Sequence, residues 1–309
     1  DMAFLACKNL ASFEVASDNI SFCSADGVLF NKDKTILIQY PIGNKRTSYI
    51  VPDNVRAIGD YSFQYCDTIE NITISESILN SGYCAFSYCS NLRNFEVDIN
   101  NEYYSSVDGV LFNKDKTKLV QYPIGNIRAS FIIPNSVKSI EYCAFLNCYN
   151  LKSITISDSV THIDTYAFSD CSELESMTIS DSVISIGKSA FEDCISFAEV
   201  YYEGTEEQWK KISIDLDNEY LMGAKIHFKK FEIHTHSYKE SITTQPTCTT
   251  AGTKTFTCSC GERTTEIILA IVHSNATTDN GTPATCTQTG FTAGKYCPDC
   301  DTWLEGHEM

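Results

Sequence analysis

The segment LKSITISDSVTHIDTYAFSDCSE, residues 151–173, is followed directly by LESMTISDSVISIGKSAFEDCIS, residues 174–196. Both are 23 residues long, and both contain the hexapeptide TISDSV in the same place. A unit of this size cannot bury its own apolar side, so a chain built from such units must stack them. The two segments therefore predict a repeat protein made of stacked coils.

Three short elements are expected in each unit. Strand alternation over residues 151–156 places Ile154 and Ile156 toward the interior. Residues 160–163 predict a second short extended piece, and AFSDC at 167–171 predicts one helical turn with its Ala, Phe and Cys facing the core. The spacing L-x-x-I-x-I is the strand signature of a leucine-rich repeat, whose units span about 20–29 residues.

A Phe followed three residues later by a Cys marks the unit along the chain. The pairs are Phe4/Cys7, Phe63/Cys66, Phe86/Cys89, Phe145/Cys148, Phe168/Cys171 and Phe191/Cys194. Successive Phe residues lie 59, 23, 59, 23 and 23 positions apart. The basic unit is therefore 23 residues, and two units carry an insertion of 36 residues.

The insertion is itself repeated almost without change. DGVLFNKDKTILIQYPIGN at residues 26–44 returns at residues 108–126 as DGVLFNKDKTKLVQYPIGN. Two substitutions separate the copies: Lys118 stands for Ile36, and Val120 stands for Ile38. The β-rich runs VLF and ILIQY, joined by the polar NKDKT, predict a hairpin with a solvated turn.

The solenoid is expected to present about eight strands on one face and to end in a cap. The strands start near Phe13, Tyr49, Ile72, Phe95, Phe131, Ile154, Met177 and Val200. In the segment EGTEEQWKKI, Thr205 and Gln208 form a capping box, and Trp209 and Ile212 share one side of the helix that follows. Residues 224–228 are expected to add a closing strand.

The SVxxIxxxAFxxCxxL rhythm, the DGVLFNKDKTxLxQYP insertion and the EGTEEQWKKI ending together resemble the BspA-like leucine-rich repeat proteins, a family of bacterial and protist surface proteins. The resemblance covers residues 1–228. Ser159 and Ser182 stand where the general leucine-rich pattern often has Asn or Cys, which is typical of this subfamily. The resemblance implies a secreted or cell-surface protein that binds a host or extracellular matrix protein, a glycan or neighbouring cells.

Composition narrows the classes of partner. The 309 residues are 43% hydrophobic, which allows a sizeable core in one long or two ordinary domains. The net charge of −17 argues against binding nucleic acid, because a grip on phosphates needs clustered Lys and Arg. No run of about eighteen apolar residues occurs, so no transmembrane segment is expected. Both ends fall within the repeat pattern, so a signal, an anchor or further repeats could lie beyond them.

The outward positions of the strand face are the candidate ligand-binding surface. Repeat alignment gives Glu14, Ile50, Thr73, Glu96, Ile132, Thr155, Thr178 and Tyr201. One interpretation makes this a binding face with Tyr201 as an aromatic contact. The other holds that Ser and Thr merely suit an exposed sheet, and that Ile50 and Ile132 are covered by the neighbouring hairpins.

The marker cysteines also allow two interpretations. In adjacent coils they would lie roughly 5 Å apart, within reach of a disulfide. The ladder consists of Cys66 and Cys89, then Cys148, Cys171 and Cys194. Because three cysteines cannot all pair and buried Cys packs as a small hydrophobe, packing is favoured. Cys23, Cys84 and Cys143 have no ladder partner and are expected to be free thiols.

After Phe231 a second, shorter repeat begins. Residues 236–260 align with residues 273–300 through His-Ser, Thr-Cys-Thr-x-x-Gly and a closing Cys pair. Each copy offers one His and three Cys: His236, Cys248, Cys258 and Cys260, then His273, Cys286, Cys297 and Cys300. Since Cys3His is a common ligand set for structural Zn²⁺, these eight residues are metal candidates.

Disulfide pairing among the six tail cysteines is the alternative, because modules this short have little core. Cys297-Pro-Asp-Cys300 has a good zinc-knuckle spacing, whereas Cys258-Ser-Cys260 is tighter than usual. The recurrence of His with the Cys favours zinc. Four protein ligands leave no open position for water, so this metal would be structural rather than catalytic.

Residues 1–230 are thus predicted to form an α/β leucine-rich repeat solenoid, rich in β structure, with 23-residue units and β-hairpin insertions. Residues 231–309 are predicted to form two small Cys/His-rich β modules. The sequence contains no phosphate loop, nucleophile elbow or open metal motif, so no enzyme is expected. Two functions remain: an adhesin-like module that binds a host or neighbouring-cell protein or glycan, or a structural spacer or cell-wall scaffold without a ligand.

Overall fold

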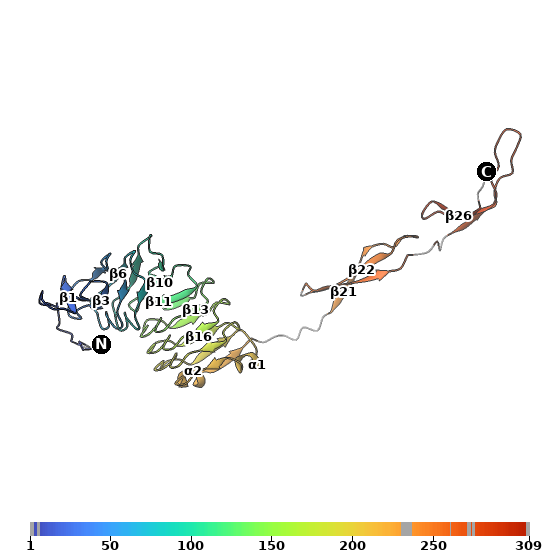
Figure 1. Ribbon diagram of the computed structural model, residues 1–309. Helices are drawn as coiled ribbons and strands as arrows, with labels where there is room; N and C mark the ends of the chain where they lie inside the picture. The colour runs from blue at the N-terminus through green and yellow to red at the C-terminus, as the bar shows by residue number, and fades with distance from the viewer. Residues whose placement is uncertain are drawn as a thin grey trace. The chain divides into compact units, whose positions relative to one another are not determined.

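The computed structural model describes residues 3–4, 7–229, 237–259, 261–270, 273 and 276–306. The chain divides into two compact units, Asp1–Lys230 and Phe231–Met309. The larger unit is a β-solenoid of about eight turns of roughly 23 residues, as the repeat predicted. Its coils lie side by side from β1 to α1 (Figure 1).

One row of strands, here called the front row, forms two parallel sheets. The first sheet contains β4 (Ser48–Ile50), β6 (Asn71–Ile74) and β8 (Asn94–Val97). The second contains β12 (Ser130–Ile132), β14 (Ser153–Thr155), β16 (Ser176–Ile179), β18 (Glu199–Tyr202) and β20 (Lys225–Phe228). Seven of the eight predicted strands are present and β20 closes the sheet, but the stretch at Phe13 forms no strand.

The other row, here called the back row, also forms two sheets, each opened by an antiparallel hairpin. The first contains β1 (Phe22–Ala25), β2 (Val28–Asn31), β3 (Ile36–Gln39), β5 (Ala57–Ile58) and β7 (Asn80–Ser81). The second contains β9 (Tyr104–Val107), β10 (Val110–Asn113), β11 (Lys118–Gln121), β13 (Ser139–Ile140), β15 (His162–Ile163), β17 (Ser185–Ile186) and β19 (Ser213–Ile214). The predicted hairpin is present twice, as β2–β3 and β10–β11. The outer strands β1 and β9 were not predicted.

The predicted interior is confirmed from the coil of Phe63 onward, whereas Phe4 is 37% exposed and Cys7 is also exposed. Ile154 and Ile163 are each 1% exposed, and Phe168 is fully buried. The ring of Phe168 stacks between those of Phe145 and Phe191, with centroid distances of 4.9 and 5.4 Å. The buried residues form two apolar clusters, each with its own column of stacked rings, and their removal from water is the main stabilising contribution to the stack.

From Phe63 onward, the segment around each marker Phe is a series of turns and not the predicted helical turn. In the coil of Phe168, Tyr166 and Asp170 have φ angles of 55° and 57°. A left-handed residue on either side of the Phe cannot continue an α-helix. The prediction failed because apolar spacing places Ala, Phe and Cys inward in either conformation.

The solenoid ends with the predicted capping box, but the helix ends at Trp209 and does not extend to Ile212 as predicted. Helix α1 (Glu206–Trp209) begins at Thr205, whose hydroxyl accepts from the Gln208 N–H while the Gln208 side chain accepts from the Thr205 N–H. A second short helix, α2 (Glu219–Gly223), buries Leu221. Neither helix in the described part of the chain has the length and apolar character that crossing a membrane requires.

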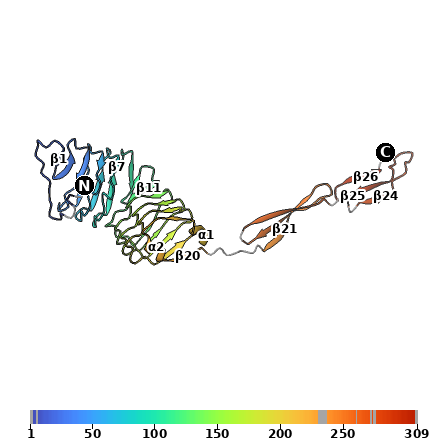
Figure 2. The ribbon, with the colours of Figure 1, turned by 60° about the horizontal axis from the view of Figure 1, so that its bottom comes forward.

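The smaller unit consists of two three-stranded antiparallel sheets. The first contains β21 (Tyr238–Thr244), β22 (Gly252–Cys258) and β23 (Arg263–Ile268). The second contains β24 (Thr277–Asp279), β25 (Gly294–Cys297) and β26 (Thr302–Gly306), which lie beside one another in Figure 2. The first two strands of each sheet lie in one copy of the tail repeat, and the third strand follows that copy.

Candidate functional sites

The predicted outward residues of the front row line up across the strands. Ile50, Thr73 and Glu96 are register partners in one sheet. The other sheet aligns Ile132, Thr155, Thr178, Tyr201 and His227 in the same way. Glu14 is exposed but lies outside any strand, so it does not belong to either ladder. We call the two ladders together the ladder face.

Two isoleucines stand out on the ladder face. Ile50 is 68% exposed and Ile132 is 69% exposed. The interpretation that the neighbouring hairpins cover them is therefore wrong: the hairpin strands pair within the back row and leave the front row open. Both isoleucines lie on the first strand of their sheet, so each forms an apolar edge to a polar ladder.

The C-terminal end of the ladder face carries an aromatic pair. Tyr201 is 44% exposed, and its ring stacks on that of His227 at a centroid distance of 4.8 Å. The Tyr201 hydroxyl donates to a Glu199 carboxylate oxygen, and this bond lowers the pKa of Glu199 below its usual value. Sequence reasoning placed β20 but missed His227, although alternation from Tyr201 across the closing strand would have identified it.

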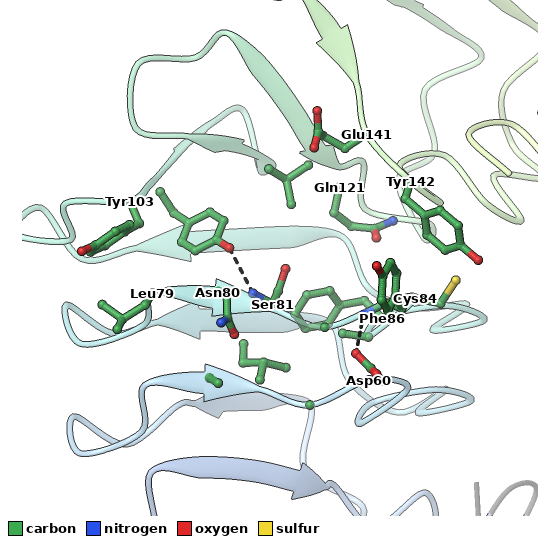
Figure 3. A pocket seen from close by; sticks show the side chains of 18 of the residues that line it. Asp60, Leu79, Asn80, Ser81, Cys84, Phe86, Tyr103, Gln121, Glu141 and Tyr142 are labelled. Atoms are coloured by element: carbon green, nitrogen blue, oxygen red, sulfur yellow. Dashed lines mark hydrogen bonds between the residues drawn. The ribbon is translucent and has the colours of Figure 1, made fainter. Parts of the chain in front are cut away.

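A cleft of about 710 Å³ opens in the back row between β7 and β11. Figure 3 shows Gln121 and Glu141 on one side of it and Leu79, Asn80 and Ser81 opposite. Ser81 pairs with Ile58 in the sheet, and the corresponding place in the coils of the second back-row sheet is aliphatic, as at Ile140 paired with Ile163. The ladder of back-row isoleucines is thus interrupted at Ser81, at the edge of its sheet.

A smaller cleft of about 620 Å³ lies at the equivalent place beside the first hairpin. Ile36 and Ile38 line it, and their counterparts Lys118 and Val120 line the larger cleft. These are the only two positions at which the nineteen-residue insertion copies differ. Lys118 also forms an ion pair of 3.3 Å with Glu141. The larger cleft is therefore charged at the position where Ile36 makes the smaller cleft apolar.

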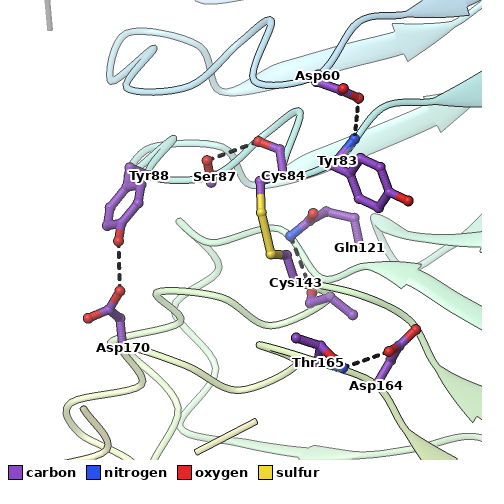
Figure 4. The surroundings of a disulfide bond; sticks show 11 residues. Asp60, Tyr83, Cys84, Ser87, Tyr88, Gln121, Cys143, Asp164, Thr165 and Asp170 are labelled. Carbon is purple, nitrogen blue, oxygen red and sulfur yellow. Dashed lines mark hydrogen bonds between the residues drawn. A yellow bond between two sulfur atoms is a disulfide. The ribbon is translucent and has the colours of Figure 1, made fainter. Parts of the chain in front are cut away.

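Cys84 and Cys143 form a disulfide, so the prediction that they are free is wrong (Figure 4). Their Cα atoms lie 5.8 Å apart, although 59 residues separate them in sequence. Units 59 residues apart meet directly at this corner: the rings of Tyr83 and Tyr142 are 5.2 Å apart. The 23-residue period does not relate Cys84 to Cys143, so the sequence did not reveal this pair.

The five ladder cysteines are buried and outside any disulfide, which agrees with the packing interpretation. Their thiols also have a recurring partner. The Cys171 thiol donates to the Phe145 carbonyl and the Cys194 thiol to the Phe168 carbonyl, each at 3.1 Å. Burial raises the pKa of Cys89 to about 12, so this thiol stays protonated at neutral pH.

The tail brings three cysteines and one histidine together. Ligand atoms of Cys248, His273, Cys297 and Cys300 all lie within 4.8 Å of one another, an arrangement that could hold a metal ion. Within this group Cys248 Sγ lies 3.5 Å from Cys297 Sγ, and Cys300 Sγ lies 3.5 Å from His273 Nδ1. The His273 side chain lowers the pKa of Cys297 to about 7, whereas burial raises the pKa of Cys248 to about 11.

This grouping differs from the predicted division into one set for each copy. Cys248 comes from the first copy and the other three residues come from the second. Cys286 is exposed and lies outside the group, and Cys258 is buried at the end of β22. His236 and Cys260 lie outside the described residues.

Comparison with known proteins agrees with the repeat architecture. The family model described as "BspA type Leucine rich repeat region" matches residues 43–125 and 122–216, with six copies. A search of curated proteins finds no match.

Among solved structures, the chain is similar to a leucine-rich repeat protein from Eubacterium ventriosum, with 23% identity, a TM-score of 0.46, and coverage of 62% of this chain and 72% of that one. It is similar to a leucine-rich cell surface protein from Faecalibacterium prausnitzii, with 26% identity, a TM-score of 0.40, and coverage of 69% and 47%. It is also similar to the pneumococcal vaccine antigen PcpA, with 20% identity, a TM-score of 0.46, and coverage of 63% and 60%.

The family match extends over more than half of the chain and coincides with the coils of the solenoid. The chain belongs to the BspA-type leucine-rich repeat family.

Proposed function

We propose that this protein is a secreted or cell-surface binding module, adhesin-like in action, that recognises an extracellular protein of a host or a neighbouring cell through its ladder face. The observation that carries the proposal is the exposure of Ile50 and Ile132, each more than two-thirds accessible on an ordered parallel sheet. Exposed apolar side chains that adjoin polar residues are a common mark of protein interaction sites.

The geometry of the ladder face suits a protein partner. Thr155 and Thr178 lie between Ile132 and Tyr201 in register, so the second sheet has an apolar contact near each end and a hydroxyl-lined centre. Parallel strands in a sheet lie about 4.8 Å apart, so three strand steps separate the two contacts by roughly 14 Å. A folded protein or an extended peptide is long enough to contact both side chains at once.

The Cys84–Cys143 disulfide supports an extracellular location. Disulfides persist in oxidising compartments and are rare in the reducing cytosol. Membership of the BspA-type family points in the same direction. Location outside the cell is part of the proposal.

We propose binding rather than catalysis, because acids on the solenoid have structural partners. Asp158 accepts from the Ser180 hydroxyl, Asp170 from the Tyr88 hydroxyl, and Asp181 from the Gln208 side chain. Each therefore contributes to joining coils to one another or to the cap.

The proposal is tested by measuring binding of the labelled full chain to a panel of immobilised extracellular matrix proteins, with glycans and purified bacterial cell wall as parallel arms. Saturable binding to a protein at micromolar concentration or below would support it. Binding to glycan alone would mean that the partner is a glycan and not a protein. Binding to cell wall alone, or to nothing, would favour the spacer or scaffold.

A further inference from the structure

We propose that Cys248, His273, Cys297 and Cys300 bind one structural Zn²⁺, and that this ion joins the two copies of the tail repeat. The proposal concerns the smaller unit and stands independently of the function proposed for the ladder face. It differs from a site closed within each copy, because the first copy supplies one ligand and the second supplies three.

The contact distances fit tetrahedral zinc. With Zn–S bonds of about 2.3 Å and Zn–N bonds of about 2.0 Å, tetrahedral angles place two sulfurs about 3.8 Å apart and a sulfur and a nitrogen about 3.5 Å apart. The structure has 3.5 Å between Cys248 Sγ and Cys297 Sγ, and 3.5 Å between Cys300 Sγ and His273 Nδ1. Since all four ligand atoms lie within 4.8 Å of one another, they leave room for a single ion between them.

Local structure explains why the second copy presents its ligands together. Cys297 is the last residue of β25, and Cys300 follows in the turn that leads into β26. The Thr302 hydroxyl donates to the Cys300 carbonyl at 3.0 Å and fixes this turn. The Cys-Pro-Asp-Cys segment therefore forms a knuckle in which both sulfurs can face one ion.

The first copy supplies Cys248 from the loop between β21 and β22. The Thr247 hydroxyl accepts from the Thr250 N–H at 2.9 Å, and the Thr247 N–H donates to the Thr250 carbonyl. This turn holds Cys248 at the tip of the loop, where it is only 6% exposed.

The second copy has the same turn around Cys286. The Thr285 hydroxyl accepts from the Gln288 N–H at 3.1 Å, and the Thr285 N–H donates to the Gln288 carbonyl. Yet Cys286 is exposed, whereas Cys248 faces His273 and the knuckle. The two loops are equivalent locally and differ in their surroundings, which makes Cys286 a matched control.

Zinc accounts for this group better than a disulfide does. One disulfide would use two of the three sulfurs and leave the third beside an unused imidazole. A tetrahedral ion engages all four side chains, and Cys3His is an established structural set. Binding requires deprotonated thiols, so zinc uptake should release protons.

The test uses the full chain, purified with zinc present, and measures zinc per chain for the parent, Cys248→Ser and Cys286→Ser. We expect Cys248→Ser to contain one zinc fewer than the parent and Cys286→Ser to contain the same amount. Cys248→His, which offers an alternative ligand at the same place, should retain the ion. This third variant separates loss of a ligand from loss of the fold.

Four results would overturn the proposal. Loss of zinc from Cys286→Ser but not from Cys248→Ser would mean that the second copy closes its own site. Equal zinc in all variants, or none in the parent, would mean that this group binds no ion. A Cys248–Cys297 disulfide found by peptide mapping without reductant would show that the sulfurs pair instead.

Discussion

Replacing Phe168 with Ala should strongly destabilise the solenoid. Phe168 is fully buried, and its ring stacks on Phe145 and Phe191 at 4.9 and 5.4 Å. Buried Phe→Ala changes cost about 3–5 kcal/mol, and aromatic pairs contribute about 0.5–1.5 kcal/mol each beyond area burial. Because the change removes a fully buried ring and two ring contacts, we expect a cost of about 4–5 kcal/mol.

The assay is urea unfolding of the full chain followed by circular dichroism. With a slope of about 2–3 kcal/mol/M, the expected cost lowers the midpoint by about 2 M. Ile195→Ala is the control: Ile195 is 67% exposed, so the change should shift the free energy of unfolding by less than about 0.5 kcal/mol. A cost below about 1.5 kcal/mol for Phe168→Ala would refute the stacked column as the main source of stability.

Three further perturbations test other features. Cys84→Ser removes the disulfide that closes a 59-residue loop, so without reductant the free energy of unfolding should fall by up to about 4 kcal/mol. An unchanged urea midpoint would contradict a stabilising role for the disulfide. Burial raises the pKa of Cys89 from 9.0 to about 12. Between pH 9 and pH 12 the thiol ionises in the unfolded chain but not in the folded one, so its contribution to stability is complete below pH 9 and falls as the pH rises. A urea midpoint that is the same at pH 8 and pH 10 would argue against this. Ser81→Ile places an isoleucine next to Ile58 in the sheet and should raise the free energy of unfolding by about 1 kcal/mol in the same assay. Destabilisation would mean that the cleft has no room for the added side chain.

The repeat made the solenoid predictable. Ile154, Ile163 and Phe168 recur at fixed spacing, and an inward position in one coil is inward in the next, so period alone determines the core. The cap was predictable for a similar reason, because Thr205 and Gln208 form a local motif three residues apart.

The features that were missed depend on contacts between distant segments. Cys84 meets Cys143 because the units on either side of the second hairpin touch at one corner, which the 23-residue period does not reveal. Alternation predicted that Ile50 and Ile132 face outward, but whether the hairpins cover them depends on which row those hairpins join.

In the tail, residue types and spacing predicted a Cys/His site but not which of the residues form it. Cys248 and Cys286 occupy the same place in their copies, in the same kind of turn. Only the packing of one copy against the next decides which of them meets His273 and the Cys297–Cys300 knuckle. Sequence alignment of the copies treats both as equivalent and cannot make that choice.

The central claim is that the ladder face binds a protein partner, and one comparison tests it most directly. Equilibrium binding of the full chain to intact epithelial cells would be measured for the parent, Ile132→Asp and Ile195→Asp. The two isoleucines are 69% and 67% exposed, but only Ile132 lies on the ladder face. The account predicts saturable binding that weakens at least about tenfold, or about 1.4 kcal/mol, in Ile132→Asp and is unchanged in Ile195→Asp. Equal affinity for all three proteins, or an equal loss in both variants, would contradict it.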